Sequence, residues 1–253
     1  MRRPPLVLTP LPGIPTVRRG NDLAALVLAA IPQAGLKMED GDIVVMAQKV
    51  ISKAEGRTVA LSGIVPSQRA EDLARKAQKD PRVVELILRE SAEVLRCRPG
   101  AVIVVHRLGF VSANAGIDAS NVEGDDTVLL LPENPDRSAA AIRANLAKRS
   151  GKKVAVVIND SFGRAWRLGT LGTAIGSAGI DTLIDMRGRP DRNGRALRAT
   201  DVGVGDELAA AASLVMGQAD EGFPIIHVRG FPYGVGEGAA ADLIRPSHLD
   251  LFR

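Results

Sequence analysis

The segment VAVVINDSFGRAWR, residues 154–167, constrains the fold of this chain more than any other stretch. It opens with five apolar residues, 154–158, and then changes to Asn159, Asp160 and Ser161. An uninterrupted apolar run bounded by polar and glycine residues is typical of a strand buried on both faces. Because ligands in α/β sheets bind beyond the carboxyl ends of the strands, the segment predicts a ligand site at Asp160 and Ser161.

The residue types at this position suit phosphate chemistry. A carboxylate beside a hydroxyl offers hard oxygen ligands to Mg²⁺ or Mn²⁺. Arg164 and Arg167 follow closely, and a guanidinium can bind phosphate oxygens through two parallel hydrogen bonds. The alternative is a strand that ends in a capped helix, with Asp160 or Ser161 as the cap and both arginines in solvent. This segment alone does not decide between the two.

Composition excludes several classes of protein. The 253 residues suffice for two modest domains or one large one, and 45% of them are hydrophobic. The formal charge of +4 comes from dispersed arginines rather than a basic block with interleaved aromatics, which favours small anionic ligands over nucleic acid. Cys97 is the only cysteine, so neither an internal disulfide nor a thiolate zinc site is expected.

The sequence also predicts a soluble, cytoplasmic protein without a membrane partner. No apolar run reaches the roughly 18 residues of a membrane-spanning helix. The apolar run near the N-terminus is short and broken by prolines, unlike a signal peptide.

Hydrophobic periodicity and capping signals predict an alternation of strands and helices. Strands are expected at 5–9, 42–48, 101–105, 127–132, 154–158 and 224–230. Helices are expected at 22–31 with Asn21 as the cap, 67–79, 81–95, 134–148, 206–216 and 238–244. Three segments are less regular: 48–57 is predicted to be a solvated loop rather than a phosphate site, 169–180 a close-packed helix or a loop, and 187–200 a basic link between domains.

The segment 109–126 is dense in small and polar residues, so it either bends around a ligand or forms a surface loop. Its apolar residues Ile117 and Val122 argue against a floppy loop. Asp118 and Asn121 are three residues apart, so on a turn they could face one ion or nucleotide. His106, just before this segment, is expected to be a packed residue rather than a catalyst.

Several long motifs in the same order resemble the coenzyme F-420:L-glutamate ligase (F-420-0:γ-glutamyl ligase) family, in its stand-alone form. They include DGDIVVMAQKVISKAEGR, GFVSANAGIDASNVEG, VAVVINDSFGRAWR and DELAAAASLVMGQADEG, and the similarity covers nearly the whole chain. The resemblance implies a two-domain α+β fold distinct from ATP-grasp. We expect one domain from 1–98 and 190–253, and a central domain from 99–189 that carries the aspartates.

The resemblance further implies a reaction and its partners. The family joins L-glutamate through its amine to a carboxylate of the deazaflavin coenzyme F-420 precursor, then adds further γ-linked glutamate, with GTP converted to GDP. It implies Mg²⁺ or Mn²⁺, together with a monovalent cation such as K⁺, and a homodimer. Two alternatives stay open: an amide ligase of the same chemistry acting on another carboxylate, and a nucleotide-binding module without catalysis.

The motifs assign roles residue by residue. By resemblance, the metal ligands are Asp118, Asp160, Ser161 and Gln218. The nucleotide or coenzyme site comprises Ile14, Pro15, Thr16, Val17, Gln48, Lys53, Asn121, Met216, Gly217, Gln218, Ala219, Asp220, Glu221 and Gly222. Lys53, Arg164 and Arg167 are the expected catalytic residues, which would screen phosphate charge.

The chemistry of the reaction agrees with these residue types. A carboxylate resists attack by an amine because its oxygen is a poor leaving group, whereas an acyl phosphate formed from GTP has a good one. Phosphoryl transfer needs cations to neutralise phosphate oxygens. The chain departs from the family pattern at Val105, Leu168, Thr170, Leu171 and Gly172. Two outcomes are open: the protein takes a somewhat altered co-substrate, or this segment lies outside the pocket and packs. The spacing favours the second, because Leu168 and Leu171 are three apart and could share one buried helical face.

Overall fold

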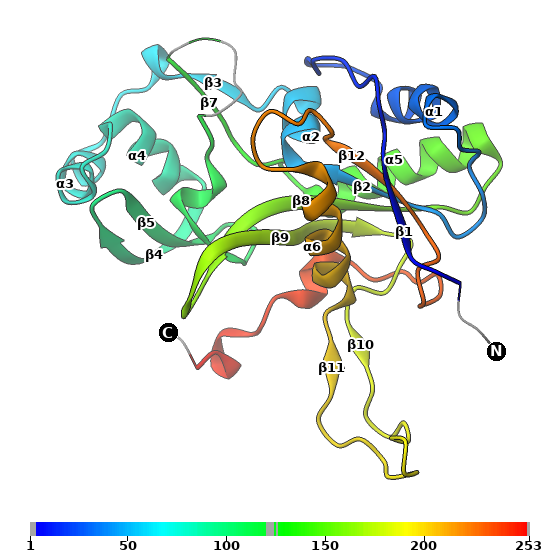
Figure 1. Cartoon of the computed structure of the whole chain (residues 1–253). Helices are drawn as coiled ribbons and strands as arrows, with labels where there is room; N and C mark the ends of the chain where they lie inside the picture. Colours follow the sequence, from blue (N-terminus) through cyan, green and yellow to red (C-terminus); the bar gives the residue numbers. More distant parts are fainter. Residues whose placement is uncertain (1–3, 120–123, 125, 252–253) are drawn as a thin grey trace.

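The computed structural model describes residues 4–119, 124 and 126–251. Within them, five strands form the central sheet in the order β1 (Val7–Pro10), β12 (Ile225–Arg229), β2 (Ile43–Ala47), β8 (Ala155–Arg164) and β9 (Arg167–Ala178) (Figure 1). β2 and β8 run parallel, and the other neighbours are antiparallel. The sheet therefore has one pair of strands whose carboxyl ends meet at the same edge.

Helices cover both faces of this sheet. α1 (Leu23–Gln33) and α5 (Pro135–Ser150) lie on one face, and α6 (Val204–Met216) lies on the other (Figure 1). Val156 of β8 packs in the core between the sheet and the helices α1 and α5, and Val157 packs in the core between the sheet and α6. Both residues are fully buried. The prediction that 154–158 is buried on both faces is confirmed.

A second group of elements packs beside the sheet. It contains α3 (Gln68–Ala77), α4 (Pro81–Arg89), β4 (Ser91–Arg98), β5 (Ala101–His106) and β6 (Val111–Ala113), with β3 (Thr58–Ala60) paired to β7 (Thr127–Leu129). Short 3₁₀ turns lie at Leu61–Gly63, Asn114–Gly116, Ala240–Leu243 and Ser247–Leu249. The α+β class is confirmed. The division into two domains stays a prediction. The strand pairs β4–β5 and β2–β8 each join a strand of the predicted first domain to a strand of the predicted central domain.

Most capping signals are confirmed, and two details are wrong. Asp80 and Asn134 accept hydrogen bonds at the starts of α4 and α5, as predicted. The cap of α1 is Asp22, whose Oδ1 accepts from Ala25 N, rather than Asn21. The helix predicted over 81–95 ends at Arg89, because the chain from Ser91 on pairs with β5 across the turn at Gly100.

Two segments have a different secondary structure from the one predicted. The predicted loop 48–57 is the helix α2 (Gln48–Glu55), which begins directly after β2 and ends at Gly56 in the left-handed conformation. Val50 and Ile51 are buried, so the helix has an apolar face that a solvated loop would lack. The predicted helix or loop 169–180 is mostly the strand β9.

The alternative prediction, a capped helix after residue 158, is wrong, because β8 continues as a strand to Arg164. β8 turns into β9 through a tight hairpin, with Trp166 at a φ of +64°. Leu168 is 99% exposed on this hairpin, so the prediction that it packs with Leu171 on a buried helical face is wrong.

The glycines of β9 allow α5 and α6 to approach the strand closely. A Cβ at Gly172 would lie 2.4 Å from the carbonyl oxygen of Ala209 in α6, and one at Gly176 would lie 2.6 Å from the Pro135 carbonyl in α5. Backbone groups cannot move aside as a flexible side chain can. Close packing of β9 between the two helices therefore requires glycine at these positions.

Gly172→Ala is accordingly expected to lower the free energy of unfolding by about 1–3 kcal/mol, the usual cost of overpacking. Leu168→Ala, on the exposed part of the same strand, should change it by less than about 0.5 kcal/mol. Urea denaturation followed by circular dichroism measures both. Equal midpoints for the two variants would contradict the packing described here.

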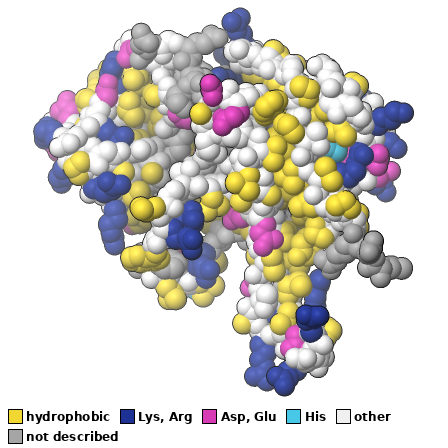
Figure 2. Space-filling model, viewed as in Figure 1, with side chains coloured by type: hydrophobic (Ala, Val, Ile, Leu, Met, Phe, Trp, Pro, Cys, Tyr) yellow, Lys and Arg dark blue, Asp and Glu magenta, His cyan; other side chains and the backbone are white. Residues whose placement is uncertain are grey.

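The segment 187–200 forms the tip of a projecting arm. Its base is the strand pair β10 (Ile184–Asp185) and β11 (Asp201–Val202), and its tip carries the arginines visible at the bottom of the space-filling view (Figures 1 and 2). None of the helices in the described ranges is long and apolar enough to cross a membrane.

Candidate functional site

The predicted crevice lies where β2 ends and its parallel pairing with β8 stops. Ala47 is paired with Asn159 in the last register position of the two strands. α2 starts at the next residue, Gln48, and Asp160 is the next residue of β8. Unpaired backbone N–H groups at a helix N-terminus favour anions, so this edge suits a phosphate group.

A cavity of about 520 Å³, here called the β2–β8 cavity, opens at this edge. It brings together most of the residues that the sequence assigned to the site: Ile14, Pro15, Thr16, Val17, Gln48, Lys53, Asp160, Ser161, Met216, Gly217, Gln218, Ala219, Asp220 and Gly222. These come from four separate parts of the chain. The fold thus gathers distant motifs around one space.

Two predicted neutral ligands are in direct contact there. Ser161 Oγ donates to Gln218 Oε1 at 2.9 Å, and Gln218 Nε2 donates to Ser213 Oγ of α6 at 2.9 Å. The second bond orients the Gln218 oxygen toward β8. Glu221 is not part of the cavity lining; its carboxylate accepts from Ala219 N and so shapes the loop after α6.

One of the predicted acidic ligands, Asp118, forms an ion pair with a lysine of α2. Lys49 Nζ lies 2.7 Å from Asp118 Oδ2, and Lys49 lines the cavity. Asp118 is held in place by backbone hydrogen bonds with Leu129 in both directions, at 3.0 and 2.8 Å. Lys49 was not among the predicted site residues, although a lysine just after a buried strand was a usable signal.

The charge of Asp160 is poorly compensated by the protein. Burial raises the pKa of its carboxyl to about 6, and the negative charge of Asp118 adds to this effect. The backbone N–H of Ser161, at 2.8 Å from Oδ1, and the charge of Lys49 act in the opposite direction. A carboxylate with a raised pKa beside a second carboxylate is stabilised by a bound cation.

The donor set therefore fits a divalent cation. Asp118 and Asp160 supply carboxylate oxygens, while Ser161 and Gln218 supply neutral ones, a combination suited to Mg²⁺ or Mn²⁺. Within the described residues no group of three or more His, Cys, Asp or Glu side chains is placed to hold a metal, here or elsewhere, so a cation at this position would depend on two carboxylates and two neutral oxygens.

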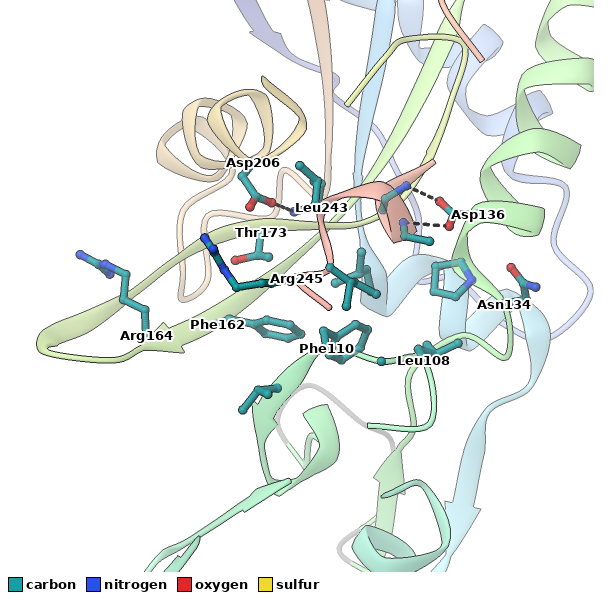
Figure 3. Close-up of a pocket in the computed structure, with 18 of the residues that line it drawn as sticks. Leu108, Phe110, Asn134, Asp136, Phe162, Arg164, Thr173, Asp206, Leu243 and Arg245 are labelled. Atoms are coloured by element: carbon teal, nitrogen blue, oxygen red, sulfur yellow. Dashed lines mark hydrogen bonds between the residues drawn. The ribbon is translucent and has the colours of Figure 1, made fainter. Parts of the chain in front are cut away.

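Asn121 falls outside the described residues, so the structure does not test its predicted role. Asp118 and Glu221 are not in the cavity lining, although Asp118 is paired with Lys49, which is. Two further predicted residues lie away from this cavity. Arg164 lines a second cavity (Figure 3), and Arg167 is exposed at the hairpin turn and lines neither cavity. Both arginines were predicted to lie close to Asp160, but β8 continues as an extended hairpin and carries them away from it. His106 is buried and stacked on Phe110, with ring centroids 4.9 Å apart, as predicted.

Fold and cavity together define an α+β protein with a cleft, lined by charged and polar side chains, beside the carboxyl end of β2. The sequence profile of the family described as F420-0:Gamma-glutamyl ligase matches residues 13–230. The chain belongs to this family.

Relatives from three archaea show the same similarity over nearly full lengths. The coenzyme F420:L-glutamate ligase of Methanothermobacter thermautotrophicus is 46% identical over 95% of this chain and 96% of its own. The protein of that name from Methanocaldococcus jannaschii is 46% identical over 85% and 86%. The one from Methanopyrus kandleri is 44% identical over 99% and 98%.

Proposed function

We propose that this protein is a ligase that joins L-glutamate, through its amine, to a carboxylate of the deazaflavin coenzyme F420 precursor and then adds further γ-linked glutamate, with GTP as the energy source. The observation that carries this proposal is the grouping of Asp160, Ser161, Gln218 and two lysines around the β2–β8 cavity. The names of the relatives supply the acceptor and the amino acid.

The reaction would proceed in two steps. An acceptor carboxylate oxygen attacks the γ-phosphorus of GTP, the bond to the β-phosphate oxygen breaks, and GDP leaves. The glutamate amine then attacks the acyl carbon, the bond from that carbon to the phosphate oxygen breaks, and phosphate leaves with the electron pair. The amine loses a proton to solvent or phosphate as the amide forms.

The residues of the cavity suit the first step. Lys53 lies one turn after Lys49 on α2, and both line the cavity, so their charges can screen phosphate oxygens. A divalent cation, Mg²⁺ or Mn²⁺, held by Asp118, Asp160, Ser161 and Gln218 would neutralise the charge that develops on the transferred group. Gln48 is buried and accepts from Ser52 Oγ at 2.8 Å, which fixes the start of the helix.

GTP is expected to stabilise the protein against heat in the presence of Mg²⁺, because a ligand bound only to the folded state raises its stability. At about 100 times the Kd, the gain in free energy of unfolding is about 2.7 kcal/mol. ATP at the same concentration should give a smaller shift. Melting curves with each nucleotide measure this, and equal shifts would remove guanine specificity from the proposal.

A test of turnover separates the ligase from a binding module. GDP and phosphate should be released only when glutamate and the deazaflavin acceptor are both present. Release without either co-substrate, or no release with both, would contradict the proposed ligase. The family resemblance also leads us to propose a homodimer, which light scattering coupled to size-exclusion chromatography can check.

A further inference from the structure

A second cavity, of about 450 Å³, lies beside the β8–β9 hairpin (Figure 3). We call it the aromatic cavity. Its walls come from five parts of the chain: the segment between β5 and β6, the start of α5, the hairpin, the start of α6, and the C-terminal segment around Leu243. Except for Arg164, none of its lining residues was assigned to the site from sequence. A space enclosed by segments so far apart in the chain is a built feature of the fold.

The floor of this cavity is aromatic. Phe110 and Phe162 lie next to each other, with ring centroids 5.1 Å apart and planes tilted by 50° (Figure 3). His106 stacks on Phe110 from the side of the protein interior. The chain has only five phenylalanines, and two of them line this cavity. Aromatic faces combined with aliphatic walls favour a flat, largely apolar ligand.

The rim of the cavity is polar and carries both signs of charge. Asp136 is fully engaged by the backbone, accepting from Ser177, Ala240 and Ala241, and Asp206 Oδ1 accepts from Ala174 N at 2.9 Å.

On the cationic side, Arg164 donates weakly to Gly169 O, at 3.3 Å, and Arg245 has no ion pair or hydrogen bond within the described ranges. Two guanidinium groups are thus available to carbonyl oxygens of a ligand. The carboxylate of Asp250 also lines this cavity.

The aromatic cavity adjoins the β2–β8 cavity along one strand. Asp160 lines the β2–β8 cavity and Phe162 lines the aromatic cavity. Both side chains are on the same face of β8 because they are two residues apart in the strand. The separation along the strand is about 7 Å. Thr173, which pairs with Asp160, also lines the aromatic cavity. A ligand with a ring at one end and a carboxylate at the other can occupy both.

We propose that the aromatic cavity binds the fused ring system of the deazaflavin acceptor, with Phe110 and Phe162 against the ring and Arg245 at its carbonyl groups. This inference rests on the proposed function. A deazaflavin is a flat heteroaromatic system whose carbonyl oxygens accept hydrogen bonds from a guanidinium. L-Glutamate is too small and too charged for an aromatic floor of this kind. The ring would thus be bound at a distance from the carboxylate that reacts.

The test measures binding of a deazaflavin ring compound that lacks the carboxylate tail, without GTP, metal or glutamate, through the change in its own fluorescence. Val111 lines the cavity and is 38% exposed, so Val111→Trp should fill the space without disturbing the core. Val65→Trp, at an 80% exposed position outside both cavities, is the matched control. We expect the Kd for the ring to rise about tenfold or more in the first variant and to stay unchanged in the second.

Three outcomes would overturn the inference: equal ring affinity in both variants, displacement of the ring by guanosine, or a change of oligomeric state in Val111→Trp with ring binding intact. The GTP-induced rise in melting temperature should be the same in both variants. Because the assay needs no turnover, ring binding without ligation would contradict the proposed function and leave this inference standing. Ligation without ring binding in the aromatic cavity would contradict this inference and leave the proposed function standing.

Discussion

Asp160→Asn is expected to lower kcat/KM for ligation by at least about 10²–10³-fold, the order of effect seen when one preorganised electrostatic group is removed from a transition state. Asp118→Asn should act similarly. In both variants an anionic oxygen ligand is replaced by a neutral amide, so the cation that neutralises the phosphate oxygens binds less well. Initial rates at saturating Mg²⁺ and Mn²⁺ measure the effect.

The stability of the Asp160 variant gives an independent readout. Burial and the neighbouring charge of Asp118 raise the pKa of Asp160 to about 6, so its ionised form opposes folding at pH 7 in the absence of metal. The metal-free Asn variant should therefore melt at the same temperature as wild type or higher, and Mg²⁺ should no longer raise it. Asp72→Asn, on the exposed face of α3, is the control and should behave as wild type. Near-normal turnover in Asp160→Asn would show that the metal assignment is wrong.

Asp42→Asn is expected to lower the free energy of unfolding by about 3–5 kcal/mol at pH 7, the usual effect of breaking a buried ion pair. Asp42 and His227 are each only 1% exposed. The Asp42 carboxylate accepts from Arg229 Nε and Nη2, both at 2.8 Å, and lies 2.9 Å from His227 Nε2. Without the carboxylate, the guanidinium loses its main partner beside the central sheet.

The same cluster predicts a pH dependence. Burial alone would raise the pKa of Asp42, but the hydrogen bonds from Arg229, with His227 beside the carboxylate, outweigh it and hold that pKa well below its usual range. A depressed pKa means that the stabilisation is complete above the unfolded-state pKa, about 4, and is lost progressively as the pH falls from there toward the lowered folded-state pKa. Denaturation by urea from pH 7 to pH 3 should show the difference in stability between wild type and Asp42→Asn shrinking below about pH 4. A constant difference across this range would contradict the assignment.

The sequence predicted the centre of the fold because its signals there are local. The apolar run 154–158 and the polar residues after it define a buried strand and its carboxyl end without reference to the rest of the chain. Asp160 and Ser161 accordingly lie at the edge where β2 ends, although β8 itself continues to Arg164. The capping residues Asp80 and Asn134 were predictable for the same reason.

The errors arose where tertiary contacts override local preference. Small residues such as Gly172 and Gly176 make β9 resemble a packed helix, whereas they permit close contact between a strand and two helices. A separate error concerns Arg164, which lies far from Asp160 because β8 continues through it. Four residues span about 13 Å in a strand but only about 6 Å in a helix. Pairs such as Asp42 with Arg229 join residues nearly the whole chain apart, and no local pattern reveals them.

The most direct test of the proposed function is mass spectrometry of the product. The protein is incubated with the deazaflavin coenzyme precursor, L-glutamate, GTP and Mg²⁺, and fragmentation locates the new bond. We expect the acceptor mass to rise by one glutamate residue, joined as an amide through its amine, with further γ-linked glutamate on longer incubation and with GDP formed in equal amount to the bonds. An unchanged acceptor in the presence of bound GTP, or glutamate attached to a different carboxylate compound only, would contradict this account.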